Sequence, residues 1–321
     1  MSFIDTIPNH GVDGFVITAG SSYLDIDAYA CCVAMWELLT LRGINAVAYS
    51  RACWNYSVCS SLTAAGQLSK KIPPEISAEK AGYLIMDVSD PNYINHDVPL
   101  ERVNAVFDHH TGYEAYWKQR IGKNAHIEFL GAAATLIFRE WKLTGLVGEM
   151  TRPTALLLIA AILDNTLNLS SANTTQEDRE AFESLCEKAG VGADWCAAYF
   201  SEVQDSVEAD LENALLKDQK RITGHSILPP RVVQLCVWDA ERILKKLDAV
   251  RNILNSDPDE WMLNLIDISR RRSYFVCDDP RCQREMERKF DVSFEGSVAN
   301  CKRSYLRKEI LRIVQDQEKN A

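Results

Sequence analysis

The sequence predicts an α/β protein with a parallel sheet in its N-terminal domain and a smaller α/β domain at its C-terminal end. Short apolar runs alternate with longer segments whose apolar residues recur at helical spacing, a pattern typical of βαβ units. A chain of 321 residues exceeds the usual size of one domain, so we expect two. We place them at residues 1–197 and 198–321.

The first domain is expected to contain at least four strands separated by helices. The segment 28–42 shows helical spacing and stops before Gly43, a residue type that commonly follows a helix. Segments 132–145 and 153–163 show the same spacing, and Thr151 precedes the second as a candidate N-cap. The expected strands are Phe15–Thr18, Ala46–Tyr49, Tyr83–Met86 and Val103–Phe107, with His126–Phe129 as a further candidate.

A polar helical stretch over 199–218 leads into the second domain, and a new α/β pattern begins after Pro230. The segments 239–255 and 280–290 show helical spacing. The expected strands of this domain are Val232–Trp238, Met262–Ile268 and Tyr274–Cys277.

The composition is that of an acidic globular protein. The net charge of −10 argues against binding to long nucleic acids or to membrane surfaces, which usually requires a basic face. The N-terminus lacks the features of a signal peptide and no apolar run reaches the length of a membrane span, so we expect a cytoplasmic protein. The ten cysteines form no Cys-x-x-Cys pair and are expected to be buried thiols.

Aspartate and histidine residues follow the apolar runs at four places. Alone, Asp25-Ile26-Asp27 would be interpreted as a solvated turn or a helix cap, and Asp87 as a cap. Because the carboxyl ends of parallel strands line one edge of a sheet, we expect these residues to meet in one crevice. So many carboxylates would repel one another unless cations lay between them, and imidazole among them favours manganese, cobalt, zinc or iron over calcium. The residues are Asp25, Asp27, Asp87, Asp108-His109-His110 and Asp164.

Positive charge is concentrated in the second domain of this otherwise acidic chain. It is carried by Arg270-Arg271-Arg272, Lys302-Arg303 and Arg307-Lys308. Basic residues near a metal-binding crevice suit a multiply charged anion such as a phosphate chain. Three arginines after a strand are also compatible with a solvated turn.

The order of these motifs resembles the DHH phosphoesterase superfamily. It is similar to the branch that contains manganese-dependent family II inorganic pyrophosphatases, cytosolic exopolyphosphatases and prune proteins. The stretch 163–168, followed by Thr174-Thr175-Gln176-Glu177-Asp178, looks like the fourth motif of that branch. Leu216–Lys220 resembles the start of its second domain, and Leu306–Glu309 stands where the branch has a Ser-Arg-Lys-Lys phosphate clamp.

The resemblance implies a DHH domain followed by a DHHA2-like domain, with the active site in the cleft between them. It implies two divalent ions, most simply Mn²⁺, with Mg²⁺ or Co²⁺ as alternatives, that activate a water for in-line attack on phosphorus. Asp87 would bridge the ions, with Asp25 on the first and Asp27, His109 and Asp164 on the second. His110, Lys220, Arg307 and Lys308 would hold phosphate oxygens, and these four with Asp87 are the expected catalytic residues.

Three positions depart from the family pattern. Ser21 stands where family II pyrophosphatases have a histidine, which the exopolyphosphatase and prune members also lack, so we expect short polyphosphate to be preferred over pyrophosphate. Leu306 and Glu309 replace the serine and the last lysine of the clamp. An acidic residue in a phosphate clamp would oppose anion binding.

Two other functions stay open at this point. The first is a phosphodiesterase acting on nucleotides or short oligonucleotides, for which Tyr113, Tyr116 and Trp117 could stack on a base, although core or lid positions explain them more simply. The second is a non-catalytic member that binds phosphorylated ligands or protein partners, which Ser21 and Glu309 would favour. Retention of the four other metal clusters favours the hydrolase.

Overall fold

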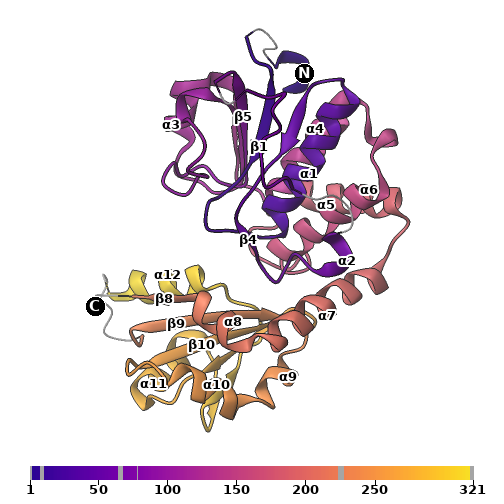
Figure 1. Ribbon diagram of the computed structural model, residues 1–321. Coiled ribbons are helices and arrows are strands. Elements are labelled where there is room, and N and C mark those ends of the chain that lie inside the picture. Colours follow the sequence, from indigo (N-terminus) through magenta and orange to yellow (C-terminus); the bar gives the residue numbers. More distant parts are fainter. Residues whose placement is uncertain (1, 8–10, 64–67, 78, 223–227, 319–321) are drawn as a thin grey trace. The chain divides into compact units, whose positions relative to one another are not determined.

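The computed structural model describes residues 2–7, 11–63, 68–77, 79–222 and 228–318 (Figure 1). The chain divides into two compact units, Met1–Tyr199 and Phe200–Ala321. Among the residues described, no helix is both long and apolar enough to cross a membrane. Each unit is built around its own sheet, as expected for a two-domain α/β protein.

The first unit contains a five-stranded sheet in the order β3-β1-β5-β6-β7, and every pairing is parallel. This confirms the expected fold class. β1 and β5 are buried along their whole length, as their continuous apolar sequences require in a sheet covered on both faces. The strands are β1 (Gly14–Thr18), β3 (Ala46–Ala48), β5 (Ala81–Met86), β6 (Val103–Asp108) and β7 (Ala125–Ile127).

Helices cover both faces of this sheet. Trp117 of α3 (Glu114–Ile121) is fully buried in a cluster with Val16, Tyr83 and Val106, which project from one face. Figure 1 shows α3 on the opposite side of β1 and β5 from α1, α4 and α5, which pack on one another. The bounds of the other helices are α1 (Ile26–Leu41), α2 (Ser60–Thr63), α4 (Ala133–Thr144), α5 (Arg152–Asn165) and α6 (Gln176–Ala189).

Local sequence signals set the ends of these helices. α1 is followed by Gly43 in the left-handed region (φ +69°), where glycine avoids the steric cost of a side chain. Thr151 caps α5 by accepting the Thr154 N–H. Smaller elements complete the unit: the parallel pair β2 (Tyr23–Leu24) and β4 (Cys53–Trp54), and the 3-10 turns at Ile4–Thr6, Leu100–Arg102, Gly122–Asn124 and Val147–Glu149.

The second unit contains a six-stranded mixed sheet in the order β12-β13-β11-β10-β9-β8. Only β9 and β10 run parallel, and the other pairs are antiparallel. Its core combines Val232, Met262 and Phe275 from the sheet with Met286 and Ile310 from two helices. The strands are β8 (Gln219–Arg221), β9 (Arg231–Val237), β10 (Trp261–Asp267), β11 (Arg272–Val276), β12 (Phe294–Glu295) and β13 (Val298–Asn300).

Two segments expected as single helices are each divided in two. The stretch 199–218 is interrupted at Asp210, which leaves helical geometry and accepts hydrogen bonds from Asn213. The stretch 239–255 is interrupted at Lys245 and Lys246, and the Lys246 ammonium pairs with Glu208. The helix α7 (Ala193–Ala209) begins in the sequence of the first unit and ends in that of the second. The other helices of the second unit are α8 (Leu211–Lys217), α9 (Ala240–Leu244), α10 (Leu247–Leu254), α11 (Pro280–Phe290) and α12 (Arg307–Glu318).

We predict that His126 weakens the fold in mild acid. Its ring stacks on Phe107 at 4.5 Å between ring centroids, and its Nε2 is buried without a hydrogen-bond partner among the described residues. Burial lowers the pKa of His126 below the ordinary 6.5, so the unfolded chain binds this proton more tightly. Stability is therefore lost as the pH falls through about 6.5. Thermal unfolding of His126→Phe should show a smaller drop in Tm from pH 8 to pH 5.5 than the parent. Equal drops would contradict this.

Candidate metal centre

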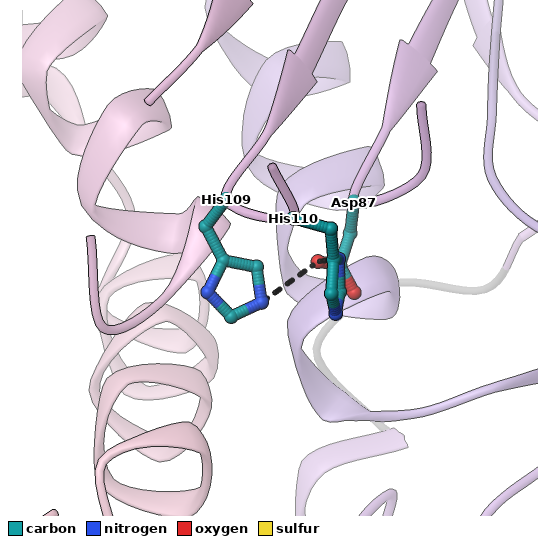
Figure 2. Close-up of side chains that lie close together, drawn as sticks. All are labelled: Asp87, His109 and His110. Carbon is teal, nitrogen blue, oxygen red and sulfur yellow. Dashed lines mark ion pairs between the residues drawn. The ribbon is translucent and has the colours of Figure 1, made fainter. Parts of the chain in front are cut away.

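Asp87, His109 and His110 meet where two neighbouring strands end. Asp87 directly follows β5, and both histidines directly follow β6, the parallel neighbour of β5. The Asp87 N–H donates to the Phe107 carbonyl at 2.7 Å, which extends the strand pairing to the site. Figure 2 shows the three side chains converging, and ligand atoms from all three lie within 4.8 Å of one another. Because β3 and β5 lie on opposite sides of β1, the switch point of the sheet is between β1 and β5, and Asp87 stands next to it at the end of β5.

The backbone of Asp87 is left-handed, with φ +56°. Non-glycine residues rarely adopt this conformation, although aspartate tolerates it better than most, and such residues occur often at functional sites. Asp87 Oδ1 lies 3.5 Å from His109 Nε2 and 3.8 Å from His110 Nδ1. This oxygen is buried and has no hydrogen-bond partner among the described residues. A buried carboxylate oxygen without a donor is costly unless a cation or a proton compensates it.

The tautomer of His109 follows from its second ring nitrogen. Nδ1 lies 3.2 Å from the Leu130 carbonyl, which can only accept, so Nδ1 must carry the hydrogen. In the neutral ring the lone pair is then on Nε2, which faces Asp87 and lies 3.9 Å from Asp27 Oδ2. A histidine held through Nδ1 by a carbonyl with Nε2 directed at carboxylates has the arrangement of a metal ligand.

Asp27 has a second role that the sequence did not reveal. Its two carboxylate oxygens accept the N–H groups of Ala133 and Ala134, each at 2.8 Å, and so cap the start of α4. Asp27 is fully buried, and burial together with the charge of Asp25 raises its pKa to about 7. The same carboxylate thus anchors a helix and faces His109.

Asp25 and Asp164 extend the acidic cluster. Asp25 caps α1 by accepting the Ala28 N–H at 3.0 Å, and its carboxyl group hydrogen-bonds that of Asp87. Burial raises the pKa of Asp25, and burial followed by the charges of Asp27, Asp25 and Asp108 raises the pKa of Asp87 well above its ordinary value. At the end of α5, burial and the charge of Asp25 raise the pKa of Asp164 to about 7.

These carboxylates fit a divalent cation. Burial pushes all of them towards the protonated form, and repulsion from neighbouring carboxylates adds to this at Asp27, Asp87 and Asp164. A cation between them would reverse both effects. Oxygen ligands mixed with an imidazole nitrogen suit manganese better than calcium. Within the described chain, the structure thus brings Asp25, Asp27, Asp87 and His109 together and places Asp164 within electrostatic reach of Asp25.

Tyr199 is a site residue that the sequence analysis did not identify. Its hydroxyl lies 3.3 Å from Asp164 Oδ1 and 3.2 Å from the Ser57 carbonyl. Burial raises the pKa of Tyr199 well above its ordinary value, so the phenol stays protonated as a donor. Tyr199 is 35 positions from Asp164, and no sequence motif links the two.

Asp108 holds His110 through two hydrogen bonds. The buried Asp108 Oδ1 accepts from His110 Nδ1 at 2.8 Å and from the His110 N–H at 3.1 Å. Burial opposes ionisation of Asp108, but its bonds to His110 and Ser89 outweigh burial and lower its pKa. In return, the bond to Asp108 raises the pKa of His110. The His110 side chain is 65% exposed, so its Nε2 is available to an anion from solvent.

Two basic residues expected to hold phosphate lie close together in the second unit. Arg307 begins α12 and donates to the Asp218 carboxylate at 2.7 Å and to the Val232 carbonyl at 3.4 Å. Lys220, exposed on β8, pairs in register with the same Val232. Lys308, the next residue of α12, is also exposed.

Glu309, the acidic residue in the clamp segment, is bound to residues that directly precede α12. One Glu309 oxygen accepts the Leu306 N–H at 2.8 Å, and the other pairs with Arg303 at 3.3 Å. This is a helix cap, which explains the glutamate without a role in anion binding. The charge of Arg270 is not available to replace a clamp residue, because Arg270 forms ion pairs with Asp239, Glu241 and Asp267.

The aromatic residues after the histidines are part of the fold. Trp117 is fully buried and its indole N–H donates to the Ser89 carbonyl at 2.7 Å. Tyr113 and Tyr116 are half-buried, and their rings pack at 6.3 Å between centroids. Trp117 therefore cannot stack on a base without unfolding α3.

Ser21 stands where family II pyrophosphatases have a histidine. Its backbone N–H donates to the Tyr93 carbonyl.

Comparison with known proteins found no matching family model. The chain is 25% identical to a probable manganese-dependent inorganic pyrophosphatase of Lactobacillus acidophilus, over 85% of this chain and 88% of that protein. A protein of the same name from Bacillus velezensis is 22% identical over 92% of this chain and 95% of its own length.

Two solved structures share the fold. A Methanococcus jannaschii protein assigned to the family II inorganic pyrophosphatases superimposes with a TM-score of 0.59 at 19% identity, covering 94% of this chain and 98% of its own. An exopolyphosphatase-related protein from Bacteroides fragilis gives a TM-score of 0.51 at 13% identity, covering 96% of this chain and 92% of its own.

The structure has a parallel sheet whose strand ends gather aspartates around an Asp-His-His triplet, followed by a smaller mixed-sheet unit, which is the arrangement that the resemblance to DHH proteins implies. The similarity to these proteins covers most of the chain, both in sequence and in fold. The chain is thus similar in sequence to probable manganese-dependent inorganic pyrophosphatases, and it shares its fold with a family II inorganic pyrophosphatase and an exopolyphosphatase-related protein.

Proposed function

We propose that the protein is a metal-dependent phosphohydrolase that cleaves phosphoanhydride bonds and prefers short polyphosphate over pyrophosphate. The observation that carries this proposal is the buried Oδ1 of Asp87, which has no hydrogen-bond partner among the described residues and faces the Nε2 of His109 beside further buried carboxylates. Relatives named as manganese-dependent pyrophosphatases support the metal and the reaction class. The preference for polyphosphate rests on Ser21, where family II pyrophosphatases have a histidine.

Five residues would hold two divalent ions, of which Mn²⁺ fits the ligands best and Mg²⁺ or Co²⁺ are alternatives. When bound, the ions would lower the pKa of a water and supply the nucleophile. Binding would require Asp87 and Asp27 to lose the protons that burial favours, so metal affinity should increase with pH. The five residues are Asp25, Asp27, Asp87, His109 and Asp164.

Four further residues would bind the phosphate groups. His110 carries a pKa raised by Asp108 and so offers a cationic donor near the carboxylates. Lys220, Arg307 and Lys308 of the second unit would supply further positive charge, and Arg307 is held in one orientation by Asp218. Their charge would stabilise the negative charge on the leaving phosphate.

The proposal is tested by removing metal from the full-length protein and adding back Mn²⁺, Co²⁺ or Mg²⁺. Phosphate release would be followed from pyrophosphate, tripolyphosphate, long-chain polyphosphate and a small nucleotide diester, with His109→Ala as the control. We expect release to be fastest from tripolyphosphate and to vanish in the control. Turnover of the diester alone would assign the protein to nucleotide phosphodiesterases. Tight metal binding without any turnover would indicate a non-catalytic phosphate-binding protein.

We predict that Lys308→Ala raises the KM for tripolyphosphate by about tenfold, because a charge-assisted hydrogen bond contributes about 1.5 kcal/mol or more. Lys302→Ala is the matched control, since Lys302 is 88% exposed in the same unit and pairs only loosely with Asp291 at 3.4 Å. Steady-state kinetics on both variants measures the difference. A KM unchanged in both would remove Lys308 from the binding residues.

A further inference from the structure

The loop before α4 determines the orientation of His109. The Leu130 carbonyl accepts from His109 Nδ1 at 3.2 Å, and this is the bond that directs Nε2 towards Asp87. Any rotation of the Leu130 peptide group would move the acceptor and release the ring. The position of His109 therefore depends on what holds residues 130–134.

Asp178, in the first turn of α6, holds this loop directly. Its Oδ2 accepts the Gly131 N–H at 2.8 Å, one residue after the carbonyl that binds His109. Its Oδ1 accepts the Thr135 hydroxyl at 2.6 Å, and the N–H and hydroxyl of Thr175 each donate to Oδ2 at 2.7 Å. Asp178 is fully buried, and its four donors come from the loop, α4 and the cap of α6. A carboxylate bound from three directions has little freedom to move.

The loop approaches Asp178 so closely that only glycine fits at position 131. A Cβ atom added to Gly131 would lie 2.6 Å from Asp178 Oδ2 and 2.5 Å from Thr166 Cγ2. On its other side, the loop is held by Asp27 through Ala133 and Ala134. Two buried carboxylates, Asp178 and Asp27, thus hold this segment, and only Asp27 faces the candidate metal centre.

We propose that Asp178 is a positioning residue, which fixes the Leu130 carbonyl and thereby directs His109 Nε2 at the metal. This inference rests on the proposed function, because it assumes that His109 is a metal ligand. A capping role alone would account for the bonds to Thr175 but not for the bonds to Gly131 and Thr135. Residues that orient a metal ligand commonly contribute about 10- to 100-fold to metal affinity.

The test is a calorimetric titration of metal-free, full-length protein with Mn²⁺ alone, which requires no turnover. Asp178→Ala is expected to bind Mn²⁺ about 10- to 100-fold more weakly than the parent. Asp178→Asn keeps one acceptor oxygen for the Gly131 N–H, and its amide can donate to the Thr135 hydroxyl, so it should recover most of the affinity. Gly131→Ala displaces the loop while Asp178 stays, and should reproduce the loss if Asp178→Ala does not fold.

Glu140→Ala is the matched control. Glu140 is a buried carboxylate of α4 that accepts the Ser2 hydroxyl at 2.6 Å and the Phe3 N–H at 2.9 Å, so these bonds hold the N-terminal segment rather than the loop at residues 130–134. It should lower Tm and leave the Mn²⁺ affinity unchanged. If Asp178→Ala and Gly131→Ala bind Mn²⁺ as tightly as Glu140→Ala, the positioning role is wrong while the metal centre stands. If the parent itself does not bind Mn²⁺, the proposed function fails and this inference fails with it.

Discussion

Replacing Asp87 with asparagine should stabilise the metal-free protein and abolish its response to manganese. Burial and the charges of Asp27, Asp25 and Asp108 raise the pKa of Asp87, so at neutral pH the fold opposes its ionisation. A group whose folded-state pKa is raised contributes stability at low pH that is lost as the pH rises above the ordinary value of 3.8. The asparagine amide has the same shape but carries no charge, so the variant does not lose this stability as the pH rises. The advantage of Asp87→Asn should therefore increase with pH.

Thermal unfolding with and without Mn²⁺ measures both effects. Each 1 kcal/mol of unfolding free energy moves Tm by about 2–4 °C in a protein of this size, and we expect the variant to have the higher metal-free Tm at pH 8. The parent should gain about 2.7 kcal/mol when Mn²⁺ is present at 100 times its Kd, and the variant should gain almost nothing. Phosphate release should be lost in parallel.

Asp90→Asn supplies the comparison for this experiment. Asp90 lies in the same loop, but bonds from Asn92 lower its pKa, so its loss should not stabilise the protein. It should also keep the response to Mn²⁺. If the metal-free Asp87→Asn protein is less stable than the parent, the ionised Asp87 carboxylate stabilises the fold and the expected effect is wrong.

Part of the candidate metal centre could be predicted from the sequence, because Asp87 and His109 come directly after apolar strands. In a parallel sheet, strand direction alone brings such residues to one edge, so Asp87 and His109 could be placed together without knowledge of their contacts. The fold class could be predicted for the same reason, since β1 and β5 are buried on both faces and show continuous apolar sequences.

Interactions between residues distant in sequence could not be predicted in this way. Tyr199 reaches Asp164 across 35 positions, and Asp178 reaches Gly131 across 47, through the packing of helices that no local motif specifies. The second role of Asp27 as a cap of α4 depends on a helix that begins 106 residues later. Conversely, Glu309 looked unfavourable for anion binding only because its capping bond to Leu306 was unknown.

The two adjacent histidines should have separable effects. His109 presents the lone pair of Nε2 to Asp27 and Asp87, whereas the Nδ1 of His110 is bound to Asp108 at 2.8 Å. A nitrogen that donates its hydrogen to a carboxylate cannot also bind a metal. The proximity of His110 Nδ1 to Asp87, at 3.8 Å, therefore does not make it a ligand.

We expect His109→Ala to lower Mn²⁺ affinity by more than about 100-fold and to abolish phosphate release, because it removes a ligand outright. His110→Ala should keep Mn²⁺ affinity within about threefold and lower kcat by about 10- to 100-fold, because it removes only a donor to phosphate. Calorimetry and steady-state kinetics on both variants give the two quantities. Equal losses of Mn²⁺ affinity would assign both histidines to the metal.

The pH dependence of kcat in Asp108→Asn tests whether His110 acts in its protonated form. The bond to Asp108 raises the pKa of His110, so the cationic ring persists to higher pH than an ordinary histidine would. Without the carboxylate, the pKa of His110 should decrease, and the alkaline limb of the kcat profile should move to lower pH. Mn²⁺ affinity should change little, since no atom of Asp108 takes the place of a ligand in the proposed site. A profile that does not move would exclude protonated His110 from the reaction and leave the neutral ring as the phosphate donor.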